Sequence, residues 1–264
     1  MDSNIEEPCY WQKGIAYITL ALIGGGCAIT ALAIAFTVLS YSTWQLALCW
    51  FFGVILIIIG LFWDSMASAA YPANIRAQER NLISLLRTHW DGKGKVLDIG
   101  TGGGRLAVPI AREFPESNVI GVDIWMKSWD SFGLTKECAE KNALIDNVAD
   151  RCTFQYGSAL ELPFEDGEFS LVVSAFTFHA ISVPDRTVLF QDALRVLVPG
   201  GVLVICDLFP RGYGVKSVLD LLEKIKRLGV EDLRHQSLKD AGVNLGRLSF
   251  IWGMAYLSGK KRSS

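Results

Sequence analysis

The chain has 264 residues, of which 51% are hydrophobic and only 20% are charged, and its mean hydropathy is +0.31. A composition this apolar excludes an intrinsically disordered chain and a small fold held together by disulfides. The net charge is −2, from 25 basic and 27 acidic residues. Nucleic-acid binding and polybasic lipid anchoring both need an excess of basic residues, so we expect no nucleic-acid partner.

The six cysteines are scattered, and no two of them form a Cys-x-x-Cys pair. A zinc site or a disulfide framework requires clustered spacing. We therefore predict reduced thiols in a reducing compartment and no metal site. The six are Cys9, Cys27, Cys49, Cys138, Cys152 and Cys206.

The first quarter of the chain is strongly apolar, because residues 14–63 contain no charged side chain. The polar stretch 40–43 divides this run into Ile15–Leu39, with 25 residues, and Trp44–Trp63, with 20. About 20 apolar residues in a helix cross the hydrocarbon core of a bilayer. We therefore predict a two-pass membrane hairpin with helices at about 15–39 and 44–63, and the bilayer as a partner.

Two other interpretations of the apolar run were weighed. A buried helical hairpin would need a larger protein to enclose it as well as a full domain. A cleaved signal peptide is also conceivable, because Ala67-Ser68-Ala69 resembles a cleavage site. That tripeptide lies beyond the usual 15–30-residue window, however, and follows two apolar stretches rather than one.

Small residues and flanking charges predict the geometry of the hairpin. Gly24-x-x-x-Ala28 and Ala31-x-x-x-Ala35 would let two helices approach closely. The segment after the second span contains arginines and the loop between the spans has no charge, which favours both flanks on the cytoplasmic side. These arginines are Arg76, Arg80 and Arg87.

We divide the chain into the hairpin (1–63), a linker helix segment (64–94) and a larger domain (95–264). Helical periodicity marks Asn74–His89. Beyond it, strands and helices alternate, which predicts a doubly wound α/β fold with a mostly parallel sheet. The strands are expected at 95–100, 118–123, 152–156, 169–176 and 201–208, and the helices at 104–114, 134–145 and 185–197. The last part predicts helices at 215–228 and 233–241, then antiparallel strands at 245–250 and 254–258.

The sharpest local motif is a glycine-rich turn between the first strand and the helix after it, Asp98-Ile99-Gly100-Thr101-Gly102-Gly103-Gly104. Such glycines allow a tight turn and close approach of a ligand at the carboxyl edge of the sheet. Asp123 ends the next strand, where a carboxylate can accept hydrogen bonds from ribose. Gly102-x-Gly104-x-x-Ala107 also fits a dinucleotide fingerprint, but Asp98 would repel a pyrophosphate and suits a cationic amino group. A merely structural acid in a tight turn is the remaining alternative.

The motif order resembles that of class I S-adenosylmethionine-dependent methyltransferases. Asp-x-Gly-x-Gly-x-Gly after a strand is similar to their first motif. The stretch 157–169 resembles their G-D-A-x-x-L-P-F-x-D-x-x-F block, and 194–201 resembles their R-V-L-K-P-G-G turn. The resemblance spans residues 93–208 and is strongest to the branch that methylates small molecules in quinone biosynthesis. It implies a Rossmann-like fold, S-adenosylmethionine as methyl donor and a methyltransferase activity.

The resemblance also implies residue roles. Asp98 and the loop Gly100, Thr101, Gly102 and Gly104 would hold the methionine part. Asp123 would bind the ribose, Ile124 or Trp125 would pack on adenine, and Ser158 and Ala159 would lie at its edge. Ser174 and the residues after it would line the methyl-transfer mouth. Two positions depart from the pattern, because Ser158 and Ser170 stand where the family usually has Asp, and the first change predicts weaker cofactor binding.

Methyl transfer needs alignment above all, and a base only when the acceptor must lose a proton. His179 follows the fourth predicted strand and could be that base, a hydrogen-bond donor to the acceptor, or a packing residue. The hairpin favours a small apolar or lipid-like acceptor, although it could equally serve only as an anchor. A nicotinamide-dependent oxidoreductase and a tethered S-adenosylmethionine-binding module without catalysis remain the alternatives.

Overall fold

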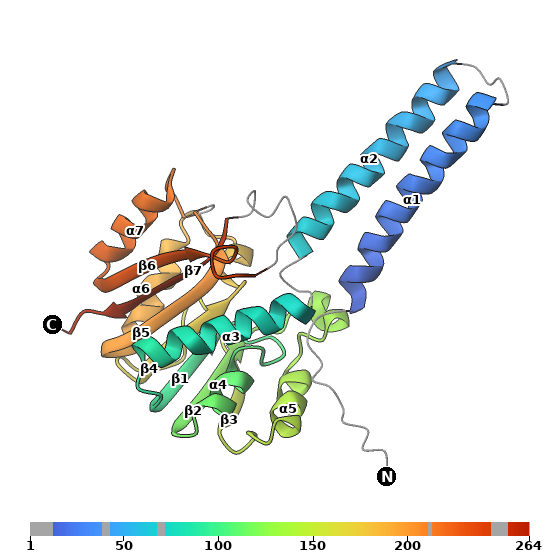
Figure 1. Ribbon diagram of the computed structural model, residues 1–264. Coiled ribbons are helices and arrows are strands. Elements are labelled where there is room, and N and C mark those ends of the chain that lie inside the picture. Colours follow the sequence, from blue (N-terminus) through green and yellow to red (C-terminus); the bar gives the residue numbers. More distant parts are fainter. Residues whose placement is uncertain (1–12, 39–42, 68–71, 211–212, 244–252, 264) are drawn as a thin grey trace, which may run out of the picture.

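The computed structural model describes the chain except for residues 1–12, 39–42, 68–71, 211–212, 244–252 and 264 (Figure 1). Helices α1 (Lys13–Val38) and α2 (Thr43–Ala67) run antiparallel and project from an α/β domain. Helix α3 (Pro72–His89) lies on that domain, one face buried through residues such as Leu82 and Leu86. Helix α3 thus follows the two-helix hairpin in the chain and precedes the first strand of the domain.

Glycines form the contact between α1 and α2. A Cβ atom on Gly26 would lie 2.9 Å from the Gly53 carbonyl oxygen, and one on Gly60 would lie 3.2 Å from the backbone nitrogen of Ile23. Nothing lies within 4 Å of a Cβ built on Gly24, so its predicted place in the contact is wrong. Each residue turns a helix by about 100°, so a contact through Gly26 puts Gly24 on another face.

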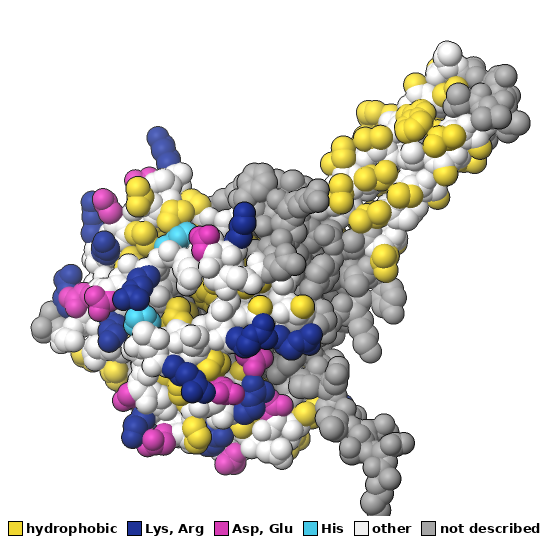
Figure 2. Space-filling view, in the orientation of Figure 1, with side chains coloured by type: hydrophobic (Ala, Val, Ile, Leu, Met, Phe, Trp, Pro, Cys, Tyr) yellow, Lys and Arg dark blue, Asp and Glu magenta, His cyan; other side chains and the backbone are white. Residues whose placement is uncertain are grey.

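The membrane prediction is supported in part. Among the described residues, Leu46–Trp63 in α2 has the length and hydropathy of a membrane span, and most of it is exposed. The apolar part of α1 whose side chains are described, Leu20–Ala35, is shorter than 18 residues. Figure 2 shows hydrophobic side chains on the hairpin and none of the charged ones that cover the domain. One candidate span is established on length and composition, and the second stays a prediction.

Seven strands form one sheet in the order β3-β2-β1-β4-β5-β7-β6. The first five are mutually parallel, whereas β7 is antiparallel to both β5 and β6. This confirms the predicted α/β sheet, mostly parallel with an antiparallel C-terminal end. The strands are β1 (Gly94–Ile99), β2 (Ser117–Asp123), β3 (Cys152–Tyr156), β4 (Phe169–Ala175), β5 (Leu197–Leu208), β6 (Val230–Ser237) and β7 (Met254–Lys261).

Helices cover both faces of the sheet, and each face has its own hydrophobic cluster. Helices α3, α4 (Ala107–Glu113) and α5 (Lys136–Ile145) contribute to one cluster. Helices α6 (Thr187–Val196) and α7 (Val218–Arg227) contribute to the other. Successive strand residues alternate between the clusters, as Val96 and Leu97 do in β1. Burial on both faces explains why the central strands are nearly continuous apolar runs.

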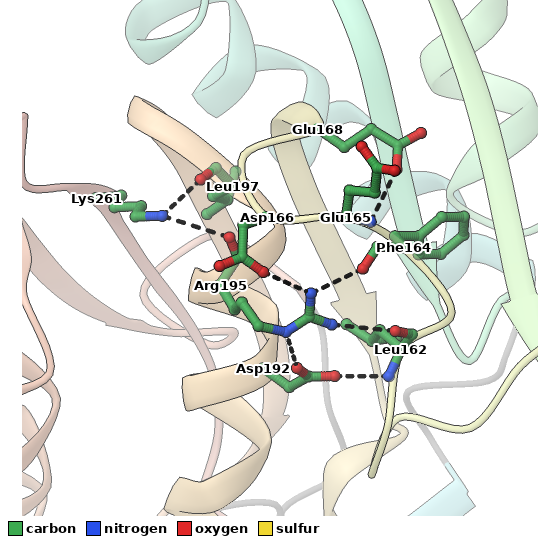
Figure 3. A network of polar contacts seen from close by, with 9 residues as sticks. All are labelled: Leu162, Phe164, Glu165, Asp166, Glu168, Asp192, Arg195, Leu197 and Lys261. Carbon is green, nitrogen blue, oxygen red and sulfur yellow. Dashed lines mark hydrogen bonds and ion pairs between the residues drawn. The ribbon is translucent and has the colours of Figure 1, made fainter.

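Arg195 in α6 ties two of the sequence motifs together (Figure 3). Its guanidinium donates to the carbonyl oxygens of Leu162, at 3.0 Å, and Phe164, at 2.7 Å, and pairs with Asp166. Asp192, one turn earlier, pairs with Arg195 and accepts from the backbone N–H of Leu162. The Leu-Pro-Phe block is therefore held against the helix that leads into β5.

The C-terminal predictions need correction. Residues 233–241 were expected to form a helix, but strand β6 occupies Val230–Ser237. Its register shifts between Glu231 and Arg234, and Asp232 has a φ of 50°. This bulge interrupts the apolar–polar alternation that identifies a strand. The expected strand at 245–250 lies outside the described residues, and the strand expected at 254–258 is β7, which pairs with β6 and β5.

Candidate active site

The glycine-rich loop between β1 and α4 forms the centre of the candidate site. Gly100, Gly102 and Gly104 have φ angles of 72°, 52° and 82°, in the left-handed region that favours glycine. The backbone N–H groups of Gly100 and Thr101 both donate to the carbonyl oxygen of Val122, at 2.8 and 3.0 Å. The loop is thereby fixed to the end of β2.

Asp98 lies under this loop and is 1% exposed. Its Oδ2 accepts hydrogen bonds from Thr101 Oγ1, at 2.7 Å, and from the backbone N–H of Ala107, at 3.2 Å. Its Oδ1 is buried with no partner among the described residues. Burial raises the pKa of Asp98 to about 7, although hydrogen bonds from Thr101 and Ala107 oppose the rise. A buried carboxylate oxygen without a partner is costly, so this position suits a cation.

Asp123 ends β2 and organises the other side of the loop. Its Oδ2 accepts from the backbone N–H of Gly102, at 2.9 Å, and its Oδ1 from that of Trp125, at 2.8 Å. The indole Nε1 of Trp125 donates in turn to the carbonyl oxygen of Gly102, at 3.0 Å. Asp123 is half-buried, and each carboxylate oxygen can accept a second hydrogen bond. Ribose hydroxyls could therefore bind there.

The residues expected around adenine lie together at the ends of β2 and β3. The backbone N–H of Gly157 donates to the carbonyl oxygen of Asp123, at 3.1 Å, which places Ser158 and Ala159 beside the end of β2. Ile124 is exposed there. The Ser158 hydroxyl accepts from the backbone N–H of Leu160, at 3.2 Å. An adenine bound between the ends of β2 and β3 would thus have an apolar side chain, Ile124, and a hydroxyl, that of Ser158, near it.

Ser174, near the end of β4, is one of the residues that line a small cavity there. It is buried in β4, and its hydroxyl donates to the carbonyl oxygen of Ile99 at 2.7 Å, which fastens β4 to β1. The next residues reach the edge of the sheet. Phe176 has a φ of 54°, which is unusual for a bulky residue; such strained backbone conformations cluster at active sites. Thr177 packs on the loop, since a Cβ on Gly100 would lie 2.0 Å from its hydroxyl oxygen.

His179 lies at this edge in a short 3-10 helix, η3 (Phe178–Ala180), and is held by Asp207 from the end of β5. The two side chains meet at 2.7 Å between Nδ1 and Oδ1. The Asp207 carboxylate also accepts from the backbone N–H groups of His179, at 3.0 Å, and Leu208, at 2.7 Å. Sequence reasoning found His179 and missed Asp207. An acid at the end of an apolar strand was the only signal for it.

Arg105 is a second residue that sequence reasoning missed. It follows the last glycine of the loop, and its guanidinium donates to the Gln78 side chain of α3, at 2.6 Å. Its guanidinium carbon lies 5.7 Å from the centre of the Phe176 ring. Arg105, Gln78 and Ile75 line a small cavity that also touches Ala175 at the end of β4. A basic residue next to the loop was its only sequence signal.

Among the described residues, no group of three or more His, Cys, Asp or Glu side chains is arranged to hold a metal ion. The site consists of a buried carboxylate, a second carboxylate, the backbone of a glycine loop, a cation and a His–Asp pair. Such a set suits a zwitterionic ligand with a ribose and no phosphate.

Comparison with known proteins agrees with this chemistry. Residues 96–201 match the family model described as a methyltransferase domain. This part of the chain is therefore similar to methyltransferase domains.

Relatives with curated names are also methyltransferases. The chain is 30% identical over 166 residues to the 27-O-demethylrifamycin SV methyltransferase of Amycolatopsis mediterranei, which covers 62% of this chain and 56% of the relative. It is 35% identical over 133 residues to the ubiquinone/menaquinone biosynthesis C-methyltransferase UbiE of Geobacter sulfurreducens, covering 50% and 48%. The chain thus spans about half the length of the curated relatives that it matches.

Solved structures share the fold of the methyltransferase domain. One is phosphoethanolamine N-methyltransferase 2 of Haemonchus contortus in complex with S-adenosyl-L-methionine, with a TM-score of 0.50, 20% identity, and coverage of 74% of this chain and 58% of that one. Another is the [4+2]-cyclase SpnF, with a TM-score of 0.52, 22% identity, and coverage of 70% and 81%. At such identities the likeness concerns the fold alone.

Proposed function

We propose that the chain is a membrane-anchored methyltransferase that transfers a methyl group from S-adenosylmethionine to a small apolar or lipid-like acceptor. The observation that supports it most is Asp98, whose buried Oδ1 lies under a glycine loop and has no partner in the described part of the chain. An ammonium group would satisfy that oxygen, whereas a phosphate would be repelled.

The other groups around the loop complete the fit to the cofactor. Asp98 would hold the methionine ammonium, and Arg105 its carboxylate. Asp123 would accept from the ribose hydroxyls, and the backbone of the glycine loop would lie against the sugar and methionine chain. Ile124, Ser158 and Ala159 would flank adenine.

S-adenosylmethionine supplies a methyl group already activated on a sulfonium, so the chain must align the acceptor and remove a proton where the acceptor carries one. We assign the proton removal to His179. The Asp207 carboxylate accepts hydrogen bonds, so the contact between His179 Nδ1 and Asp207 places the imidazole proton on Nδ1. Nε2 of His179 is then free to accept a proton. The His179 side chain is 33% exposed, so an acceptor can reach it.

The hairpin supports an acceptor from the membrane. We propose that α1 and α2 both span the bilayer and that both flanks, with the methyltransferase domain, lie on the cytoplasmic side. Arg76, Arg80 and Arg87 after the second span favour that side. A hydrophobic acceptor in the same bilayer would meet the tethered domain at a raised local concentration.

Two alternatives are distinguishable. A tethered module that binds S-adenosylmethionine without catalysis is favoured by Ser158, which stands where the family usually has Asp. A nicotinamide-dependent oxidoreductase would place a pyrophosphate near Asp98, which the charge of that residue opposes. The resemblance of the fold to a protein named as a cyclase illustrates that such a domain can serve other chemistry.

The test uses the purified full chain in vesicles. Calorimetry with S-adenosylmethionine, its demethylated product and NAD should show saturable binding of the first two only. Tritium-methyl S-adenosylmethionine is then added to vesicles doped with total membrane lipid extract, and label is expected in the organic phase. Binding without labelled product favours the binding module, and binding of NAD alone favours the oxidoreductase. If the protein neither binds S-adenosylmethionine nor forms labelled product, the proposal is overturned.

A further inference from the structure

The hairpin joins the domain at the same edge of the sheet that carries the candidate site. Helix α1 contacts η2 (Lys127–Phe132), which begins four residues after β2 ends at Asp123. Helix α3 begins at Pro72, and its Ile75 lines the small cavity that touches Ala175 at the end of β4. Figure 1 shows the base of the hairpin beside this carboxyl edge. Any bilayer that holds the hairpin therefore lies closer to this edge than to the opposite one.

The surface at this edge carries exposed apolar side chains, with basic residues near them and the exposed acids Asp130 and Glu161 among them. Met126 and Leu160 are 48% and 54% exposed, and the strands that precede them are neighbours, since Asp123 pairs with Tyr156. Lys127 is exposed next to Met126. Figure 2 shows further basic side chains along α3, whose exposed residues include Arg76 and Arg80.

Exposed apolar side chains with cations near them can bind the interface of a bilayer with anionic lipids. The apolar pair alone could equally meet a protein. The covalent hairpin decides between these occupants, because a membrane that contains it is held against this edge at high effective concentration.

We propose that the carboxyl edge of the sheet rests on the membrane surface, with Met126 and Leu160 in its interfacial layer. The acceptor would then enter the site directly from the lipid phase without crossing water. This inference rests on the proposed function, because it requires the hairpin to be inserted in a bilayer. It adds the orientation of the domain and the route of the substrate.

Photo-crosslinking tests the orientation. The photoreactive amino acid p-benzoylphenylalanine replaces Met126, Leu160 or, as a matched control, Leu144 in the full chain. Leu144 is an apolar residue, 66% exposed, in the last turn of α5, from which the chain returns to the start of β3 at the opposite edge. The three proteins are reconstituted in phosphatidylcholine–phosphatidylglycerol vesicles with a fluorescent phosphatidylcholine and irradiated.

We expect fluorescent lipid adducts at positions 126 and 160 that are several-fold stronger than at 144, and weaker when phosphatidylglycerol is left out. Equal labelling at all three positions, or adducts only between protein chains, would overturn the orientation. Calorimetry with S-adenosylmethionine on the same vesicles keeps the two ideas separate. Normal binding with equal labelling refutes the orientation alone, and selective labelling without binding refutes the methyltransferase alone.

Discussion

The Nδ1 atom of His179 lies 2.7 Å from Oδ1 of Asp207, a residue with no exposed surface. The same carboxylate accepts from two backbone N–H groups, of His179 itself and of Leu208. A carboxylate held by three donors fixes the orientation of the imidazole ring. His179 therefore presents Nε2 away from Asp207.

If His179 is the base, His179→Ala should lower kcat by about 10² to 10⁴ while the Kd of S-adenosylmethionine stays nearly constant. Asp207→Asn should also lower kcat, because the amide no longer selects the tautomer. Single-turnover transfer of tritium-methyl to the lipid-extract acceptor measures the rate. With an acceptor that is already ionised, His179→Ala should lower the transfer rate less than with an acceptor that must lose a proton. A merely structural role of His179 would lower both rates equally.

His89→Ala is the matched control, because His89 lies at the far end of α3 and contacts Arg234 instead. It should keep full activity. A His179→Ala protein as active as His89→Ala would refute the assignment of the base.

The order of the fold could be predicted because its central strands are buried on both faces. Residues such as Val96 and Leu97 pack on opposite clusters, so the strands are continuous apolar runs whose limits stand out. Strand β6 lies at the edge of the sheet and contains a bulge at Asp232, so its pattern imitates a helix. The sequence pattern of apolar residues therefore does not reveal a strand that lies at the edge of the sheet and contains a bulge.

The candidate site shows the same division. Asp98, the glycine loop and Asp123 belong to one strand–helix–strand unit that the motif marks, so their contacts follow from that unit. Asp207 and Arg105 acquire their partners only through folding, since 28 residues separate Asp207 from His179 and 27 separate Arg105 from Gln78. The Ser174 hydroxyl likewise acquires its partner only through folding, because it donates to the carbonyl oxygen of Ile99, 75 residues earlier in the chain.

Asp98 should make cofactor affinity depend on pH. Burial raises its pKa to about 7, and an ammonium partner favours the ionised form. Between pH 5.5 and 7 the ionised share of such a group grows from about 3% to about 50%, so the association constant should rise about sixteenfold. The ligand's own amino group stays protonated there, because its pKa is about 8.

Calorimetry in buffers of different ionisation enthalpy should detect proton release on binding. Asp98→Asn should bind more weakly and lose both the pH dependence and the proton release. Without ligand the sign is reversed for folding: the raised pKa contributes stability that is full below about pH 4 and is lost as the pH rises to about 7. A pH-independent affinity in the native protein would remove Asp98 from the ammonium site.

Ser158 offers a gain-of-affinity test. The family usually has Asp at this position, and a carboxylate accepts a stronger hydrogen bond from the adenine amino group than a hydroxyl does. Ser158→Asp should therefore tighten S-adenosylmethionine binding about fivefold, which is about 1 kcal/mol. The inosine analogue, which has a carbonyl in place of that amino group, should not gain. Ser158→Ala controls for loss of the hydroxyl, and an equal gain for both ligands would place Ser158 elsewhere.

Arg195 should be important for stability rather than for binding. It donates to the carbonyl oxygens of Leu162 and Phe164 and pairs with Asp166 and Asp192. Arg195→Ala would leave these carbonyls without their donor, at a cost of about 2 kcal/mol, and lower the Tm by about 5 °C. Arg195→Lys should recover only part of this stability, because a single ammonium group cannot reach both carbonyl oxygens and both carboxylates at once.

Arg87→Ala is the control, because it removes only an exposed ion pair with Glu113. It should barely change the Tm, measured by circular dichroism of the full chain in detergent. Equal shifts for the two alanine variants would show that the Arg195 network adds no more than an ordinary surface pair.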